Sequence, residues 1–191
     1  MSTSSLITLN FVDHVVGREQ QEDPDCRQVA AVLLTCPERQ SICLYLPTAA
    51  KRDRRENWCP PQGGIKRTET PCSAAMRELR EELGIVKLQC LEYLGSVYRE
   101  YESGHPRSYS YRRGHYHWLF AQATDYTLSM EKGVADAGYH HGGSVLHWCM
   151  EKMSMEKAYM LKGVILRALE GPLAGIRLWQ EQRHLLMPQA A

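Results

Sequence analysis

Three glutamates, Glu78, Glu81 and Glu82, have the residue type and the spacing that could hold a metal ion. In a helix they would project together, because residues three and four apart are neighbours on its surface. Within a cleft their mutual repulsion raises a carboxyl pKa unless a cation compensates it. Oxygen ligands suit a hard divalent ion such as Mg²⁺, which also takes substrate phosphate as a ligand. The chemistry we predict is polarisation of a phosphoryl oxygen and activation of a bound water.

Arg77 and Glu69 stand close to these glutamates in the sequence. Arg77 lies one turn before Glu81 and can reach Glu69 if the loop ahead of the helix folds back, and either contact would orient a carboxylate rather than bind metal. These residues belong to one unbroken pattern from Gly63 to Ile85, G-x5-E-x7-R-E-U-x-E-E-x-G-U, in which U is aliphatic. The glutamate-rich fragment alone is more simply a solvated helix face, but nine matched positions make chance a poor explanation.

The complete pattern resembles the box of the Nudix hydrolase (MutT-like) family, and the surrounding sequence can be aligned loosely over residues 27–170. The resemblance implies an α/β/α sandwich with a mixed β-sheet, and Mg²⁺- or Mn²⁺-dependent hydrolysis of a diphosphate linked to another moiety. It implies the metal ligands Glu78, Glu81 and Glu82, completed by a backbone carbonyl at Gln62 or Gly63. It further implies that Glu82 or a loop carboxylate helps to activate water, and that Arg77 and Glu69 form a supporting pair.

The segment from Trp58 to Gly64 reads W-C-P-P-Q-G-G. It resembles the W-x-x-P-Q-G-G segment of the Nudix branch that hydrolyses dinucleoside polyphosphates and removes pyrophosphate from RNA 5′ ends, although that branch usually has an aromatic at the place of Pro60. Tyr101 resembles the aromatic of the diadenosine-polyphosphate group. The candidate substrate-binding residues are therefore Trp58, Gln62, Gly63, Gly64, Arg55 and Tyr101. Two simpler roles stay open: Trp58 packing over the core, and a solvated loop for the charged run 51–55.

The expected substrate is a dinucleoside polyphosphate or a 5′-triphosphorylated RNA end. A nucleoside diphosphate sugar, ADP-ribose or a nucleoside triphosphate remains open, and so does a non-catalytic Nudix module that only binds a nucleotide. A pure binding site does not need three converging acids, which favours the enzyme. The general base is not decided, because Asp125, Glu131 and Asp136 all lie in a stretch that resembles a loop.

The elements that must position these residues follow from local patterns. Thr70 and Pro71 predict the start of a helix and Gly84 its end. The expected core face of this helix comprises Cys72, Ala75, Met76, Leu79 and Leu83, and the small Ala74 should leave space above the carboxylates. Strands are expected at 29–34, 41–46, 88–101 (one long or two short), 116–123 and 145–150, with a short strand at 6–12 and a helix at 156–170.

The chain of 191 residues is long enough for one well-buried domain. We predict an N-terminal extension (1–25), the Nudix domain (26–172) and an apolar tail (173–191) that packs back or forms a subunit contact, which leaves a homodimer open. The net charge of +1 means that any RNA contact must come from a local patch.

No apolar run has the length needed to span a membrane, and residues 1–9 lack the charged start and hydrophobic stretch of a signal peptide, so we expect neither feature. Its seven scattered cysteines argue against disulfides or zinc and predict a reducing cytoplasm. The histidine pairs 115/117 and 140/141 are expected in a strand and in a flexible loop respectively, without a metal.

Overall fold

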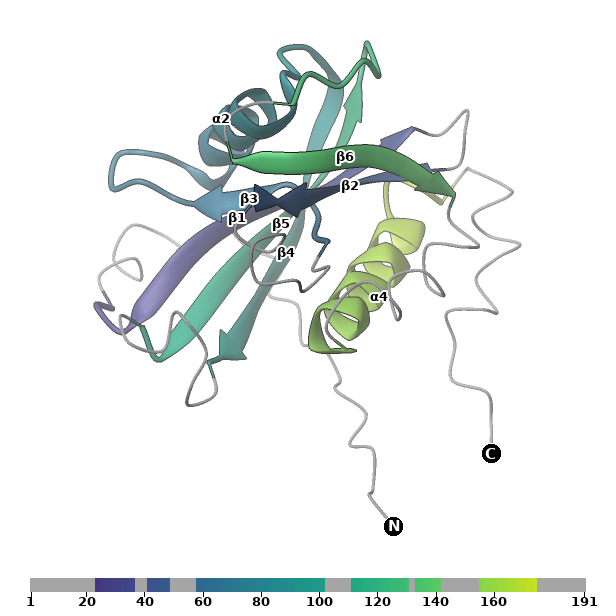
Figure 1. Ribbon diagram of the computed structural model, residues 1–191. Helices are drawn as coiled ribbons and strands as arrows, with labels where there is room; N and C mark the ends of the chain where they lie inside the picture. The colour runs from purple at the N-terminus through teal and green to yellow at the C-terminus, as the bar shows by residue number, and fades with distance from the viewer. Residues whose placement is uncertain are drawn as a thin grey trace.

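The computed structural model describes residues 23–36, 41–48, 58–101, 111–130, 133–141 and 155–174. Its centre is a six-stranded sheet with the order β4-β5-β1-β2-β6, in which β3 pairs with β1 beside that path (Figure 1). The pairing of β1 with β5 is parallel, and the other pairings are antiparallel. The strands are β1 (Cys26–Cys36), β2 (Ser41–Pro47), β3 (Gln62–Gly64), β4 (Leu88–Glu100), β5 (Arg113–Ala123) and β6 (Val134–His141).

Two helices cover this sheet from opposite sides, α2 (Pro71–Leu83) and α4 (Met155–Glu170), as Figure 1 shows. The predicted α/β/α sandwich with a mixed sheet is therefore confirmed. The helix predicted at 156–170 is α4, and the strands predicted at 29–34 and 41–46 lie within β1 and β2. No helix within the described ranges is long and apolar enough to cross a bilayer.

One edge of the central strand β1 pairs with β5, and the opposite edge pairs with β2 at one end and with β3 at the other. This arrangement positions the candidate site. Strand β1 pairs with β2 only at Thr35 and Cys36, and with β3 at Val29 to Ala31. The strand is buried on both faces from Val29 onward, as its unbroken apolar run predicts. The short strand β3, expected only as a glycine loop, thus brings Gly63 and Gly64 to the middle of the sheet.

The ends of α2 agree with the sequence, but its buried face is rotated. Thr70 caps the helix by accepting a hydrogen bond from the Ser73 amide, and Gly84 ends it with a left-handed φ of 70°. The core face was predicted to include Cys72, which is exposed, and Met76, which is only half-buried. Ala74 is instead fully buried, so its small side chain lets the helix pack closely and leaves no space for a ligand. The residues of α2 that do lie in the core are Pro71, Ala74, Ala75, Glu78, Leu79 and Leu83.

The clearest error of the sequence interpretation concerns residues 134–141. The stretch expected to be a loop, with Asp136 and His140 in it, is the strand β6, which pairs with β2 along Ser41 to Pro47. It lacks a clear alternation because Gly138 and the half-buried positions around it interrupt the pattern, so pairing with β2 decides its conformation. The strand predicted at 116–123 begins earlier, at Arg113. The region predicted at 88–101 is one strand, Leu88–Glu100, with two register shifts.

Several predictions fall outside the described residues. These are the strands at 6–12 and 145–150, the charged run 51–55 with Arg55, and the tail after residue 174. The domain boundaries at residues 25 and 172 therefore stay predictions. Six of the seven cysteines lie in the described part and are free thiols there, four of them buried as small apolar groups.

Candidate active site

Close packing of β3 against α2 brings Gly63 and Glu78, both predicted site residues, into contact. A Cβ atom added at Gly63 would lie 1.9 Å from Oε1 of Glu78, a distance that real Cβ atoms do not reach. A larger residue at position 63 would therefore displace the Glu78 carboxylate, and the backbone angle of Gly63 sets no such limit. Glu78 itself is only 9% exposed, which is unusual for a glutamate.

Arg77 connects the glutamates of the site to one another and to β3. Its Nε donates to Oε1 of Glu69 at 2.6 Å, and its Nη2 donates to Oε2 of Glu69 at 2.9 Å and to the Gly64 carbonyl at 2.8 Å. Its Nη1 donates to Glu78 and, at 3.2 Å, to Oε2 of Glu81. The hydrogen bonds from Arg77 lower the pKa of the Glu69 carboxyl to about 2. The pairing of Arg77 with Glu69, predicted if the loop folds back, is present in this structure.

Glu82 is held on the other side of α2 by groups outside the box. The hydroxyl of Tyr45 donates to Oε1 of Glu82 at 2.5 Å, and the Gln62 amide donates to Oε2 at 3.2 Å. Burial raises the pKa of Glu82 to about 8, and the charges of Glu78 and Glu81 add to the shift, while the two hydrogen bonds oppose it. A carboxyl group with this pKa takes up either a proton or a cation near neutral pH.

Sequence reasoning missed Tyr45, which is buried in β2, 37 residues before Glu82. Its place in an apolar strand gave no signal, because a buried tyrosine in β2 is expected to pack. The contact arises only when β2 and α2 meet across the divided edge of β1. Its consequence is that Glu82 has a fixed orientation before any ligand binds.

The three glutamates do not form a finished metal cage, contrary to the expected convergence. Among the described residues, no three acidic, histidine or cysteine side chains gather closely enough to hold an ion. The reason is that each carboxylate has another partner, since Arg77 binds Glu78 and Glu81 while Tyr45 binds Glu82. The donor set still fits Mg²⁺ or Mn²⁺, because the ligands are all oxygens and three carboxylates share one guanidinium, with Glu82 held by other groups nearby. Their excess negative charge is the property that a cation would compensate.

The predicted substrate-binding residues separate into two groups. Gln62, Gly63 and Gly64 of β3 lie against the glutamates, as described above. Trp58 is 9% exposed and packs edge-to-face on His140 with ring centroids 5.4 Å apart, which is the packing role left open for it. Tyr101 is 7% exposed at the end of β4, where its hydroxyl lies 3.3 Å from the Tyr116 hydroxyl. Substrate contacts by these two aromatic residues stay predictions.

The candidates for a general base lie in different surroundings. Asp125 is exposed and accepts hydrogen bonds from the amide and hydroxyl of Thr127, which lower its pKa. Asp136 is not in a loop but in β6, where it is exposed opposite Leu46. Glu131 lies outside the described residues. Glu82 has the raised pKa that suits a base, although its assignment to that role stays a prediction.

A narrow cleft next to Glu82 was not found from the sequence. It is lined by Cys59, Pro60, Gln62, Arg99, Tyr116, Trp118, Lys157 and Met160. The residues come from β3, β4, β5, α4 and the segment before β3, so no local pattern connects them. Gln62 links the cleft to the site, because its amide binds Glu82. Its walls carry two cations and two aromatic rings, but its volume of about 10 Å³ is that of a single water molecule and admits neither a phosphate nor a base.

Comparisons with known proteins identify the family and the fold of the chain. The family model of the NUDIX domain matches residues 26–150. An RNA pyrophosphohydrolase of Nitratiruptor sp. is 36% identical over 63 residues, which cover 33% of this chain and 39% of that protein. An RNA pyrophosphohydrolase of Xanthomonas campestris pv. campestris is 49% identical over 48 residues, which cover 25% of this chain and 23% of that protein. The matches thus span less than half the length of these relatives.

Solved structures share the fold over most of the chain. A MutT protein of Methanosarcina mazei has a TM-score of 0.59 at 15% identity and covers 78% of this chain and 96% of its own. The E. coli dihydroneopterin triphosphate pyrophosphohydrolase has a TM-score of 0.58 at 14% identity, with 79% and 95% covered. A C. elegans Ap4A hydrolase in a binary complex has a TM-score of 0.54 at 18% identity, with 78% and 98% covered. At these identities the likeness concerns the fold alone.

Proposed function

Because this chain belongs to the Nudix domain family, we propose that it is a divalent-metal-dependent pyrophosphohydrolase. Its substrate is a nucleoside diphosphate-linked molecule, and the two favoured forms are a dinucleoside polyphosphate and the 5′-triphosphate end of an RNA. Water attacks one phosphorus atom and the phosphoanhydride bond breaks. Homodimer formation and a cytoplasmic location stay predictions.

The observation that carries this proposal is the concentration of acidic groups around one arginine. Glu69, Glu78 and Glu81 all contact Arg77, and Glu82 is half-buried beside them with a pKa raised to about 8. An excess of carboxylates is costly in a buried setting, so its presence favours a cationic ligand. The apolar packing of α2 is supplied by Ala75, Leu79 and Leu83, and packing alone does not require four carboxylates around one arginine.

Glu78, Glu81 and Glu82 would hold Mg²⁺ or Mn²⁺. The bound ion would neutralise charge on the diphosphate and lower the pKa of a water molecule. Arg77 positions the glutamates, and Glu69 fixes the guanidinium from its far side through two hydrogen bonds. Tyr45 and the Gln62 amide hold Glu82 in one orientation. A proton can be taken up by Glu82, because its raised pKa lies close to neutral pH.

Two observations favour the dinucleoside polyphosphate and RNA forms. The W-x-x-P-Q-G-G segment places Gln62 and both glycines at the carboxylates. The curated relatives that match part of the chain are named RNA pyrophosphohydrolases. A nucleoside diphosphate sugar, ADP-ribose or a nucleoside triphosphate is the alternative substrate class, and a nucleotide-binding module without turnover is the alternative function.

A substrate panel tests the proposal. The full chain would be incubated with 5′-triphosphorylated RNA, diadenosine tetraphosphate, ADP-ribose, a nucleoside diphosphate sugar and nucleoside triphosphates, each with and without Mg²⁺ or Mn²⁺. Products would be identified by mass. We expect metal-dependent cleavage of a phosphoanhydride bond, fastest for the first two substrates. Metal-enhanced binding with no cleavage of any substrate would leave only the binding module.

A further inference from the structure

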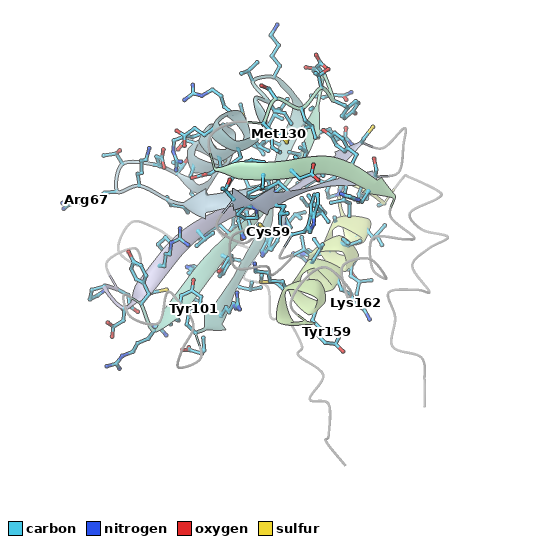
Figure 2. All side chains as sticks on the ribbon, in the orientation of Figure 1. Cys59, Arg67, Tyr101, Met130, Tyr159 and Lys162 are labelled. Carbon is cyan, nitrogen blue, oxygen red and sulfur yellow. The ribbon has the colours of Figure 1, made fainter. Side chains whose placement is uncertain are left out.

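A polar groove of about 1000 Å³ lies where the start of β1 meets the loop between β3 and α2. Its walls include Arg27, Gln28, Gly64, Lys66, Arg67 and Tyr111. Figure 2 shows Arg67 at the outer end of this loop, far from the sheet. The volume is at the upper limit of small-molecule pockets, but such pockets are mostly apolar and this groove is not.

The groove has more positive than negative charge. Arg27, Lys66 and Arg67 contribute three cationic side chains, and Lys66 and Arg67 are exposed. The acidic residue of the wall, Asp23, is paired with Arg113. The whole chain carries a net charge of only +1, so this is a local patch and not a general property of the surface.

The groove begins beside the candidate active site. Gly64 lines the groove, and its carbonyl accepts a hydrogen bond of 2.8 Å from Arg77, which contacts the glutamates. Arg27 lies next to Gly64 on the side of β3 that faces away from Glu78. A Cβ atom added at Gly64 would be 3.4 Å from Nη2 of Arg27. None of the four glutamates lines the groove, so a chain whose terminal phosphates reach Glu78 would enter the groove by passing Gly64 between Arg27 and the loop.

We propose that this groove binds the nucleotides that follow the 5′ end of a single-stranded RNA, so that RNA and not a dinucleoside polyphosphate is the substrate that uses the whole surface. This proposal rests on the proposed function. Cationic side chains along a groove bind successive phosphates, and an aromatic side chain such as Tyr111 stacks on a base. A dinucleoside polyphosphate has no phosphodiester chain beyond its second nucleoside, so it leaves most of the groove unused.

The test is a pair of charge reversals with equal changes in net charge. Lys66→Glu/Arg67→Glu alters the groove, and Lys87→Glu/Lys162→Glu alters exposed or half-buried lysines outside it. Binding of a 5′-monophosphorylated, 3′-labelled RNA of about ten nucleotides is measured by fluorescence anisotropy at several salt concentrations. Turnover of triphosphorylated RNA and of diadenosine tetraphosphate is measured in parallel, and thermal melting checks that each variant folds.

We expect the groove variant to bind the RNA at least tenfold more weakly. The slope of the logarithm of its affinity against the logarithm of salt concentration should decrease in magnitude by about two. The variant outside the groove should change affinity by less than about twofold, because exposed charges at a distance are screened. Tyr111→Ala should weaken binding about five- to tenfold, and Tyr111→Trp should restore it. The loss of turnover on RNA should exceed the loss on diadenosine tetraphosphate.

Equal losses of RNA affinity in both charge variants, or tighter binding of duplex than of single-stranded RNA, would overturn the groove proposal. Turnover losses of the same size on both substrates would overturn it as well. The two proposals can fail separately. If the groove binds RNA as expected but no substrate is cleaved, the proposed hydrolase function falls. If diadenosine tetraphosphate is cleaved but the groove variant binds RNA as tightly as the wild type does, only the groove proposal falls.

Discussion

Two clusters of titratable side chains lie on this sheet, and they differ in how their charge is compensated. In the first, Glu69, Glu78 and Glu81 share Arg77, and Glu82 is held by Tyr45 and the Gln62 amide. In the second, His115 and His117 of β5 are buried among neutral partners. The partners are Gln28, Tyr93, Ser96 and Tyr98.

The histidine cluster is neutral and mostly hydrogen-bonded, although the buried Nδ1 of His115 has no hydrogen-bond partner among the described residues. His117 can accept from the Tyr93 hydroxyl at 3.0 Å and donate to the Gln28 side chain at 3.1 Å. His115 bonds the Ser96 hydroxyl at 2.8 Å and stacks on Tyr98 with centroids 4.0 Å apart. Burial lowers the pKa of His115 to about 4 and that of His117 to about 3, so both rings are neutral near pH 7. Neutral groups with hydrogen-bond partners stabilise a fold and need no ligand.

The glutamate cluster keeps uncompensated negative charge, and under the proposed function this difference separates a binding site from a structural network. Burial alone does not separate them, because the two histidines are at least as buried as Glu78. A shifted pKa does not distinguish the two clusters either, because Glu82 and His115 both have one. The criterion is whether the groups present satisfy each other in charge as well as in hydrogen bonds.

The largest expected effect comes from removing one charge at the glutamates. Glu81→Gln and Glu82→Gln, each made singly, should lower turnover by about 10²–10⁴-fold, because a group that stabilises transition-state charge is lost. Both variants should melt at the same temperature as the wild type or higher, since repulsion among the carboxylates decreases. The checks are steady-state kinetics and calorimetry, with Glu92→Gln on β4 as the matched control. Unchanged turnover in both variants would remove the metal-ligand assignment.

Gly63→Ala should have the next largest effect, because its Cβ atom would collide with Oε1 of Glu78. We expect roughly a 10–10²-fold loss of turnover and a loss of about 1–3 kcal/mol in the free energy of unfolding. Gly64→Ala is the neighbouring control and should be milder, since its Cβ atom meets only the end of Arg27 at 3.4 Å. In Gly63→Ala/Glu78→Ala the stability should recover while activity does not. Equal losses of turnover and stability in Gly63→Ala and Gly64→Ala would contradict the close approach of Gly63 to Glu78.

Tyr45→Phe tests the orientation of Glu82 without changing its charge. Loss of the 2.5 Å hydrogen bond should weaken Mn²⁺ affinity and lower turnover by about tenfold, the usual cost of losing a group that orients a metal ligand. Tyr159→Phe, which removes an exposed hydroxyl on α4 (Figure 2), should change neither quantity. Metal affinity that is identical in Tyr45→Phe and the wild type would show that Glu82 needs no support from β2.

The histidine cluster should affect stability alone and only in acid. Its folded-state pKa values of about 4 and 3 lie below the ordinary value of 6.5, so the unfolded chain binds more protons between these limits. Stability should therefore be fully present above pH 6.5 and fall, on the order of a few kcal/mol for the pair, as the pH decreases toward 4. Thermal melting of His117→Gln should show a flatter dependence on pH than the wild type. The same slope in both proteins would mean that His117 is not held neutral.

Local patterns were sufficient to predict the parts of the site that lie within one element. The ends of α2 at Thr70 and Gly84 and the apolar run of β1 follow from capping and burial rules. The contact of Arg77 with Glu69 follows from helical spacing and a loop that folds back. The role of Gly63 as a position of close approach could also be anticipated from its type, although Glu78 as the contacting group could not.

Contacts between distant elements could not be predicted. Tyr45 meets Glu82 only because β1 pairs with both β2 and β3, and no spacing in the sequence encodes that division. The strand β6 depends on pairing with β2, since Gly138 and its neighbours show no alternation. The buried face of α2 differs from the expected one because the helix packs on β1 and β3 in an orientation that buries Ala74 and leaves Cys72 exposed.

The most direct test of the glutamate cluster as a cation site is a titration of Mn²⁺ into the full chain, followed by calorimetry. We expect saturable binding that weakens at least tenfold in Glu81→Gln/Glu82→Gln and is unchanged in Glu92→Gln. Mn²⁺ affinity that is the same in all three proteins would contradict the proposed role of these carboxylates.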